Sequence, residues 1–371
     1  MVEWKKLGEV CKTITPPKKL EKELYGVNGA FPIIDQGQKD IVGYTNDETS
    51  LVPNDEYILF GDHTRYVKYF NGSFAQGADG LKILKAANGI LPRYFFFSFE
   101  NVDVPSRGYS RHWSIAKELI IPIPSLDEQQ RIVGILDTFT SAIDNLKEQI
   151  AQRRKQYEYY RDQLYYPNKR ALLKASEDGK VEVKTLDEIG TFTRGRRFVR
   201  TDIVPEGVPC IHYGDMYTYY GISADTTPTH LTKEIAAKLR FAKKGDVVIV
   251  AAGENDIDIG VGVAWLGNED VVVHDACFIY KHDMNPKYIS HYLRSGNYHQ
   301  QIRMGVVDGK ICSISAKELG RALIPVPPLC EQQRIVSILD TFEASVRNLE
   351  QQLAQREKQY EYYRNKLLTF E

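Results

Sequence analysis

Two stretches of the chain are nearly the same: Glu128–Tyr165 is EQQRIVGILDTFTSAIDNLKEQIAQRRKQYEYYRDQLY, and Glu331–Leu368 is EQQRIVSILDTFEASVRNLEQQLAQREKQYEYYRNKLL. They match at an offset of 203 residues with 25 identities. Just upstream, Ile121-Pro-Ile-Pro124 corresponds to Ile324-Pro-Val-Pro327, whereas the rest of the chain shows almost no internal similarity. The chain is therefore built as a variable block, a shared block, a second variable block and a second shared block.

Both shared blocks carry a heptad pattern of apolar residues. Gaps of four and three residues alternate, and one polar residue interrupts each pattern, Arg153 in the first copy and Arg356 in the second. A 3.5-residue repeat of this length predicts a coiled-coil seam, and about 37 helical residues extend over about 55 Å. The predicted seam positions are Ile132, Leu136, Phe139, Ile143, Leu146, Ile150, Tyr157, Tyr160 and Leu164, followed by Ile335, Leu339, Phe342, Val346, Leu349, Leu353, Tyr360, Tyr363 and Leu367.

Two seams on one chain are buried most simply when they pair with each other. We expect an antiparallel pair, because the segment between the copies must return across a whole variable block. The alternative is that each helix packs only on its own neighbouring domain, although heptad runs this long are rare in such helices. Arg153 and Arg356 either fix the register of the seam or turn out of it towards solvent.

Local signals mark the ends of the two helices. Ser125-Leu-Asp-Glu128 predicts a capping box for the first helix, whereas Pro328 stands at the corresponding place in the second copy and Pro167 ends the first helix. These signals divide the chain into a first variable domain at 1–126, a helix at 127–166, a linker at 167–182, a second variable domain at 183–329 and a second helix at 330–371.

The two variable blocks combine short β runs with turns and a few helices. The predicted fold class is α+β, with two mixed α/β domains separated by two long helices that pair as an antiparallel coiled coil. The expected strands are Glu56–Phe60, Arg65–Phe70, Leu81–Leu84, Val208–Tyr213, Asp246–Ala252, Val261–Leu266 and Val271–Tyr280; Lys233–Leu239 and Pro286–Ser295 are expected to be helical, and Pro92–Phe97 to be helix or strand.

Composition and charge limit the classes of function. The 371 residues include 48 Lys and Arg and 49 Asp and Glu, so the net charge is −1 and any binding of nucleic acid must depend on local basic patches. No apolar run approaches the length of a membrane span, and the N-terminus has no apolar signal core. The five cysteines are scattered, which predicts a cytoplasmic protein without a disulfide framework or zinc site.

Several loops of the variable blocks carry groups that suit DNA. Gly61–Arg65 surrounds a glycine turn, Arg107–His112 combines two arginines with Tyr and His, and Arg194-Gly-Arg-Arg197 presents three guanidinium groups, whose mutual repulsion favours a nearby anion. Arginine reads guanine, carboxylates accept from cytosine, and Lys, Ser and Thr mostly contact phosphate. For any single residue, a solvated loop role is the alternative. The DNA-binding candidates are His63, Thr64, Arg65, Lys68, Arg107, Tyr109, Arg111, His112, Arg194, Arg196, Arg197, His212, Tyr213, Asp215, His230 and Lys310.

The usual signatures of catalysis are missing from the sequence. Gly305–Ile311 has too few residues between its glycines for a phosphate loop, and Asp256–Gly260 is only a fragment of a calcium loop. There is no His-Glu-x-x-His, no Gly-x-Ser-x-Gly and no Asn-Pro-Pro-aromatic segment of the kind that amino-methyltransferases use. The sequence therefore predicts neither catalytic residues nor a metal site.

The whole pattern resembles the DNA-specificity subunit of type I restriction–modification systems. The resemblance lies in two variable domains, each followed by I-P-x-P, then E-Q-Q-R-I-V-x-I-L-D and a long helix; Thr229–Thr232 with Lys244–Val247 also resembles the second-domain pattern of that family. It implies two target-recognition domains that recognise a bipartite, asymmetric DNA target, because a rigid spacer fixes the distance between two unlike half-sites.

The resemblance also implies partners. A specificity subunit of this family is not itself an enzyme: it recruits two methyltransferase (modification) subunits and, through them, restriction (translocase–endonuclease) subunits. No cofactor is expected on this chain, because S-adenosylmethionine, ATP and Mg belong to those partners. The alternatives are a self-contained methyltransferase or nuclease and a coiled-coil scaffold with no role on DNA. The residues expected at the partner interface are Gln129, Gln130, Arg131, Gln332, Gln333 and Arg334.

Overall fold

The structure, a computed structural model, describes residues 2–165 and 181–370. The expected linker at 167–182 lies almost entirely outside the described residues. The chain divides into two compact units, Met1–Glu148 with Glu350–Glu371 and Gln149–Leu349, which we call the first unit and the second unit. Each unit therefore holds one variable block, the start of one long helix and the end of the other.

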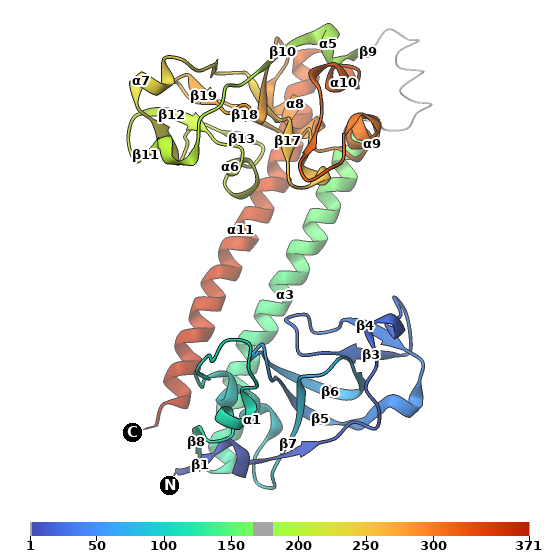
Figure 1. Cartoon of the computed structure of the whole chain (residues 1–371), viewed down its shortest axis with the longest axis vertical. Helices are drawn as coiled ribbons and strands as arrows, with labels where there is room; N and C mark the ends of the chain where they lie inside the picture. The colour runs from blue at the N-terminus through green and yellow to red at the C-terminus, as the bar shows by residue number, and fades with distance from the viewer. Residues whose placement is uncertain (1, 166–180, 371) are drawn as a thin grey trace. The chain divides into compact units, whose positions relative to one another are not determined.

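The first unit is built on a six-stranded sheet in the order β2-β7-β5-β6-β3-β4, in which only the β3–β6 pair is parallel (Figure 1). A separate two-stranded ladder joins β1 to β8. The strands are β1 Glu3–Lys6, β2 Cys11–Ile14, β3 Phe31–Ile34, β4 Gly43–Thr45, β5 Leu51–Gly61, β6 Val67–Gln76, β7 Leu81–Ala86 and β8 Ile120–Ile123, and the helices are α1 Pro92–Glu100, α2 Trp113–Ala116 and the long α3 Leu126–Tyr165.

Aromatic residues form the core of the first unit beside the two-stranded ladder. Helix α1, which Pro92 begins, buries Phe95, Phe97 and Phe99 against Phe60 of β5. The start of α3 joins this core, and Leu368 at the end of α11 (Leu329–Leu368) is buried in it too. Pro92–Phe97 is therefore helical, and the predicted strands of this block are confirmed, although β6 begins two residues later than expected.

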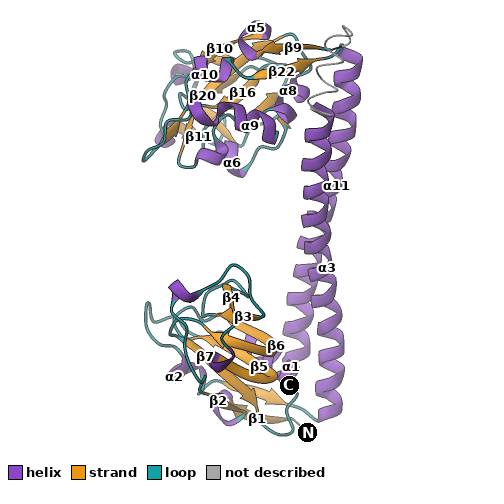
Figure 2. Cartoon of the chain, turned by 90° about the vertical axis from the view of Figure 1, so that its right-hand side faces the viewer, coloured by secondary structure: helices purple, strands orange, loops and turns teal. Residues whose placement is uncertain are grey.

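The second unit contains two five-stranded sheets, ordered β10-β20-β16-β18-β13 and β11-β14-β12-β19-β15, and two short ladders, β17–β21 and β22–β9. Figure 2 shows these strands with the short helices around them. The strands are β9 Glu182–Thr185, β10 Gly190–Arg194, β11 Ile203–Val204, β12 Val208–Ile211, β13 Ser223–Ala224, β14 Thr229–Leu231, β15 Phe241–Ala242, β16 Val247–Val250, β17 Ala252–Gly253, β18 Gly262–Trp265, β19 Val271–Val273, β20 Cys277–His282, β21 Cys312–Ser313 and β22 Leu323–Val326. The helices are α5 Leu186–Ile189, α6 Asp215–Thr218, α7 Lys233–Ala236, α8 Pro286–Tyr292, α9 Gly296–Ile302, α10 Ala316–Gly320 and the long α11.

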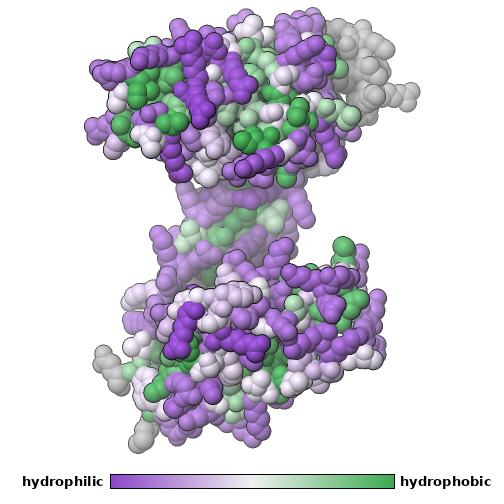
Figure 3. All heavy atoms as spheres, viewed as in Figure 1, coloured by the Kyte–Doolittle hydropathy of each residue, from purple (hydrophilic) through white to green (hydrophobic). Residues whose placement is uncertain are grey.

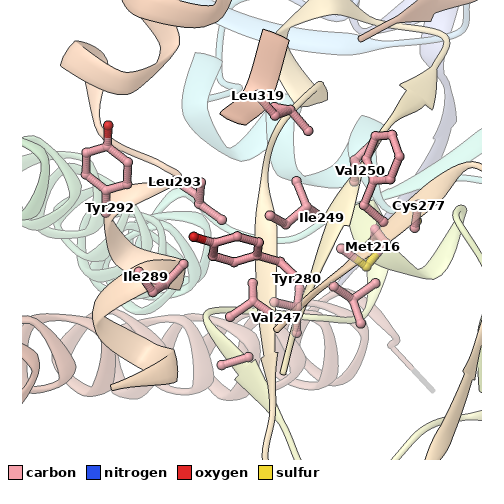
Figure 4. Close-up of a cluster of buried hydrophobic side chains, with 14 of the residues drawn as sticks. Met216, Val247, Ile249, Val250, Cys277, Tyr280, Ile289, Tyr292, Leu293 and Leu319 are labelled. Carbon is pink, nitrogen blue, oxygen red and sulfur yellow. The ribbon is translucent and has the colours of Figure 1, made fainter. Parts of the chain in front are cut away.

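The apolar run Val247–Val250 is buried at the centre of the second unit. It packs with Tyr280 of β20 and with Ile289 and Leu293 at α8 (Figure 4). A strand that is buried on both faces needs a continuous apolar sequence, and this run has one.

One strand prediction is wrong in an informative way. Val271–Tyr280 is not one strand: β19 belongs to one five-stranded sheet and β20 to the other, with a turn at His274-Asp275-Ala276 between them. The Cys277 N–H donates to the His274 carbonyl oxygen at 3.0 Å, and the Ala276 N–H donates to Nδ1 of His274 at 3.1 Å. These two bonds close the turn, so an apolar run that looks continuous changes sheets.

The two long helices contact each other in both units. In the first unit, Phe139 of α3 stacks on Tyr363 of α11 with ring centroids 5.2 Å apart, and Lys147 lies 3.8 Å from Glu357. Residue numbers therefore rise along one helix as they fall along the other. In the second unit, Tyr160 of α3 stacks on Phe342 of α11 at 5.4 Å.

The interrupting arginines lie across these ring pairs. Arg356 lies 5.8 Å from the ring centroid of Phe139, and Arg153 lies 6.0 Å from that of Phe342. Each guanidinium also donates to a glutamine on its own helix, Gln359 and Gln156 respectively, at 3.1 Å. Each arginine thus lies against an aromatic ring of the other helix, while its guanidinium bonds a glutamine on its own helix.

Each variable block holds the start of its long helix by the same contacts. Gln129 is 1% exposed; its Nε2 donates to the Pro124 carbonyl at 3.0 Å and its Oε1 accepts from the Leu91 N–H at 2.9 Å. Gln332, 203 residues later, donates to the Pro327 carbonyl at 2.8 Å. Pro124 and Pro327 directly follow strands β8 and β22 and end the two I-P-x-P segments, so the repeat preserves a junction between strand and helix.

The predicted capping box is only half present. The Glu128 N–H donates to Oγ of Ser125 at 3.4 Å, but the Glu128 carboxylate bonds Arg131 instead, at 2.6 Å and 2.8 Å. The pair Glu331–Arg334 repeats this arrangement in the second copy. An arginine three residues along offers two donors to the carboxylate, which one main-chain N–H cannot match.

The junction predicts a specific loss of stability. Replacing Gln129 by Met keeps the volume but leaves the Leu91 N–H and the Pro124 carbonyl without partners, so we expect the free energy of unfolding to fall by about 2–4 kcal/mol. Urea unfolding measures this difference. The neighbouring exposed Gln130→Met is the control and changes stability by less than about 0.5 kcal/mol; equal effects of the two variants would contradict the role of Gln129.

Candidate DNA interface

In the first unit, the structure brings two of the predicted loops together. The main-chain N–H of buried His112 donates to the Asp62 carbonyl at 2.8 Å, and the Trp113 N–H donates to the Asp62 carboxylate at 2.7 Å. Nε2 of His112 accepts from the Arg107 N–H at 3.0 Å. His112 therefore fastens the loop at 107–112 to the loop at 61–65 and has no surface of its own to offer DNA.

The exposed side of these joined loops is aromatic and basic. Tyr109 is 90% exposed and stacks on His63, with ring centroids 4.8 Å apart and planes 13° from parallel. Arg107 and Arg111 flank it and are exposed. Arg65 sits in a left-handed turn, with φ of 64°, and donates from a terminal nitrogen to the Val104 carbonyl at 2.8 Å. Four predicted residues, His63, Arg107, Tyr109 and Arg111, thus share one surface.

Two predicted residues of the first block point inward. The ammonium of Lys68 donates to the carbonyl groups of Asp35 and Lys39, and burial lowers the pKa of Lys68. Oγ1 of Thr64 donates to the Gln36 carbonyl. Lys68 fastens the loop that contains Asp35 to β6, and Thr64 fastens it to the turn between β5 and β6, so the structure gives both side chains a role in holding that loop.

In the second unit, a glycine shapes the arginine-rich loop. A Cβ on Gly195 would lie 2.2 Å from the His274 carbonyl oxygen, so only glycine allows the loop to pass the turn between β19 and β20. The Arg196 N–H donates to the Val273 carbonyl, and its guanidinium donates to the Lys238 carbonyl at 2.7 Å. Arg194, Arg196 and Arg197 are all exposed.

Tilted and edge-on ring contacts join this loop to the next predicted segment. Tyr213 and His212 both lie against His274, with ring centroids 5.3 Å and 4.9 Å away, and Phe198 packs against the same imidazole at 5.0 Å. Burial lowers the pKa of His274, which His212 lowers further and Asp275 raises. Burial likewise lowers the pKa of His212, so both imidazoles are neutral at pH 7.

Asp215 and His230 are turned towards the protein. The Asp215 carboxylate accepts from Oγ1 of Thr229 at 3.1 Å at the start of α6. His230 lies in β14, and its Nδ1 is buried without a hydrogen-bond partner among the described residues.

A pocket of about 480 Å³ collects groups from five separate segments of the second unit. It contains three predicted residues, and it adds Glu254, His274 and Asp275, which the sequence analysis missed. The available signal was the polar pair His274-Asp275 inside an apolar run. The lining residues are Arg194, Tyr213, Ala252, Gly253, Glu254, His274, Asp275, Ala276, Lys310 and Ile311.

The predicted partner residues divide into two groups. Gln129 and Gln332 are buried in the helix junctions, so their side chains are not available on the surface of this chain. Gln130, Arg131, Gln333 and Arg334 are exposed, and each arginine is paired with the glutamate three residues before it. In the described ranges, 2–165 and 181–370, no group of three or more metal-ligating side chains gathers, and no helix has the length and apolarity to cross a bilayer.

Comparison with known proteins decides the family. Residues 1–153 and 178–357 match the family described as type I restriction modification DNA specificity domain. The chain belongs to this family. It is therefore a type I specificity subunit, the component that recognises DNA sequence.

Relatives and solved structures agree with this assignment. The chain is 29% identical to the EcoR124I/EcoR124II specificity subunit of Escherichia coli over 100% of its own length and 94% of the relative's, and 27% identical to a putative specificity subunit of Haemophilus influenzae, over 100% and 96%. The crystal structure of the S subunit from M. genitalium superposes with a TM-score of 0.59 at 16% identity, covering 100% of this chain and 97% of that one. A structure from a study of complex assembly and conformational transition in the type I system has a TM-score of 0.56 at 17% identity, over 99% and 97%.

On the faces that Figure 3 shows, hydrophilic residues predominate in each unit and apolar residues form only small areas. Such surfaces suit wet, charged contacts with DNA better than a dry protein interface. The structure therefore offers this specificity subunit two candidate surfaces for DNA, one in each unit: the joined loops around Tyr109 and the pocket around Arg194.

The buried histidines of the second unit predict a dependence of stability on pH. Burial lowers the pKa of His282 to about 4, whereas an exposed imidazole in the unfolded chain titrates near 6.5. The unfolded state therefore binds the proton first, and stability falls as the pH drops below about 6.5. From His282 alone we expect a loss of about 2 kcal/mol between pH 7 and pH 5.

Urea unfolding at pH 7 and pH 5, followed through Trp265 with Trp4 and Trp113 changed to Phe, tests this for the second unit. Nδ1 of His282 accepts a hydrogen bond from the Met284 N–H at 3.1 Å. His282→Asn keeps an acceptor for this N–H and removes the titrating imidazole. The variant should reduce the difference in the free energy of unfolding between pH 7 and pH 5 by about 2 kcal/mol. An unchanged difference would show that His282 is not the group responsible.

Proposed function

We propose that this specificity subunit recognises a bipartite, asymmetric DNA target through its two variable blocks, which α3 and α11 hold at a fixed spacing as an antiparallel coiled coil. The observation that carries the proposal is that each compact unit contains the start of one long helix and the end of the other. Two helices that each run from one variable block to the other form a spacer, and the number of helical residues sets the length of that spacer.

The contacts of the helix ends support this arrangement. In the first unit, the hydroxyl of Tyr360 donates to Glu100 of α1 at 2.6 Å, and Arg364 lies 3.0 Å from the same carboxylate. In the second unit, the hydroxyl of Tyr157 lies 2.8 Å from Nδ1 of His291 in α8. Tyr157 and Tyr360 are equivalent positions of the repeat, so each helix end contacts the corresponding short helix of a variable block.

The ring pairs supply the register of the proposed coiled coil. Phe139–Tyr363 and Tyr160–Phe342 belong to one antiparallel register, because the residue numbers of both pairs add to the same value. The centre of that register lies between Gln149 and Ile150 on α3 and between Gln352 and Leu353 on α11. A rigid strut between two unlike readers gives two half-sites with an unread gap.

Recruitment of partners completes the proposal. The exposed residues beside the helix starts, Gln130, Arg131, Gln333 and Arg334, are repeated at one offset, so the chain presents the same surface twice and suits two copies of a modification subunit. Restriction subunits would join through those copies. S-adenosylmethionine, ATP and Mg would act on the partners in the cytoplasm, and this chain would supply recognition alone.

The direct test is methylation in cells. Sequencing of modified bases with and without the gene should reveal a bipartite methyl-adenine motif with two different halves that depends on the gene. The chain should also copurify with a methyltransferase subunit. Methylation or cleavage by the purified chain alone would support a self-contained enzyme instead, and failure to bind duplex DNA with its partners present would support a scaffold with no role on DNA.

The spacer makes a second, quantitative prediction. Insertion of seven helical residues after Gln149 and seven after Gln352 keeps the register and lengthens each helix by about 10 Å. The unread gap of the motif should then grow by about three base pairs. The matched control inserts seven residues into α3 alone, which breaks the pairing and should abolish methylation; an active double insertion with an unchanged gap would contradict the spacer.

A further inference from the structure

The pocket of the second unit is surrounded by charges of both signs. Arg194 and Lys310 supply two cations, and Glu254 and Asp275 supply two carboxylates. Within the part of the chain that the structure describes, no ion pair joins either cation to either carboxylate. Opposite charges around one small pocket usually pair with each other, so their separation here leaves donors and acceptors for a ligand that carries both kinds of group.

The Arg194 guanidinium is held in place by the main chain. Its Nε donates to the Asp275 carbonyl oxygen at 2.7 Å, and its Cζ lies 5.9 Å from the ring centroid of Phe278. The side chain is exposed, and its two terminal nitrogens have no hydrogen-bond partner among the described residues. An oriented fork with two free donors suits a ligand with two neighbouring acceptors.

The Asp275 carboxylate beside this fork has no Lys or Arg partner among the described residues. Its Oδ1 lies 3.2 Å from Nδ1 of His274, but that nitrogen accepts from the Ala276 N–H, and Nε2 lies 3.1 Å from the Phe198 carbonyl. These two contacts favour the tautomer with its proton on Nε2, and burial, which lowers the pKa of His274, favours the neutral ring. The carboxylate therefore remains an acceptor without a neutralising cation.

The chemistry of the pocket points to a base edge. A phosphate would be attracted by Arg194 and Lys310 but repelled by Asp275 and Glu254. The major-groove edge of a G·C pair offers two neighbouring acceptors, N7 and O6 of guanine, and then the N4 amino donor of cytosine. An A·T pair places its donor between its two acceptors, so it does not give a fork two adjacent partners.

We propose that this pocket reads one G·C base pair of the DNA half-site contacted by the second unit, with Arg194 donating to N7 and O6 of guanine and Asp275 accepting from N4 of cytosine. Lys310 and Glu254 flank the pair. This inference rests on the proposed function, because it names the base pair that one of the two readers would recognise. It makes Arg194 and Asp275 determinants of specificity at the same position.

The test uses the chain with its modification subunits in cells and compares the methylated motif of variants. Arg194→Gln and Asp275→Asn should each relax one position, the same G·C pair in one half of the motif, and leave the other half unchanged. Lys243→Gln removes a positive charge from the same unit outside the pocket and should keep the motif. The inference is overturned if the two variants relax different positions, if the relaxed pair is A·T, or if methylation weakens equally at all sequences.

If the variants lose all methylation, a measurement on the wild-type protein still tests the inference. The purified complex is titrated with duplexes in which 7-deazaguanine, which lacks N7, replaces one guanine at a time. One guanine in one half-site should reduce affinity about tenfold or more, and insensitivity at every guanine would overturn the inference. A wild-type strain without any bipartite motif would instead contradict the proposed function itself.

Discussion

An apolar stripe that runs along forty residues of helix must be covered along its whole length, and this requirement organises the molecule. A variable block covers only the first turns: Ile132 and Leu136 of α3 are buried in the core of the first unit, and Ile335 and Leu339 of α11 in that of the second. Further along, each stripe is covered by rings of the other helix. Each long helix therefore packs in both ways that the heptads allowed: its first turns pack on the neighbouring domain, and later turns pack on the other helix.

The repeat made the long helices predictable, because a pattern kept over five heptads leaves few other ways to bury its apolar side. Both helices are confirmed to within three residues at their ends. The pattern could not show that Gln129 and Gln332 are structural. A glutamine near an arginine at a helix start looks like exposed polar surface. Only the three-dimensional structure reveals that its amide bonds the proline carbonyl that follows the preceding strand.

The variable blocks were less predictable, and the reasons are local. Val271–Tyr280 has the apolarity of one strand, but a side-chain bond of His274 turns the chain into a second sheet. Lys68 and His112 belong to residue types that often bind DNA, yet both side chains hydrogen-bond main-chain groups within the fold. That these loops contact DNA stays a prediction. Which of their polar side chains are exposed depends on which ones bond the main chain, and the sequence does not show this.

The equivalence of the two junctions separates two kinds of change. Gln129 and Gln332 contact the main-chain carbonyl groups that end the two I-P-x-P segments, and these groups are the same whatever side chains the neighbouring loops carry. Tyr109 and Arg194 lie outside these junctions, so a substitution at either residue leaves the contacts of Gln129 and Gln332 in place. The exposed loops of the variable blocks can therefore change in sequence while the attachment of each block to its long helix stays the same.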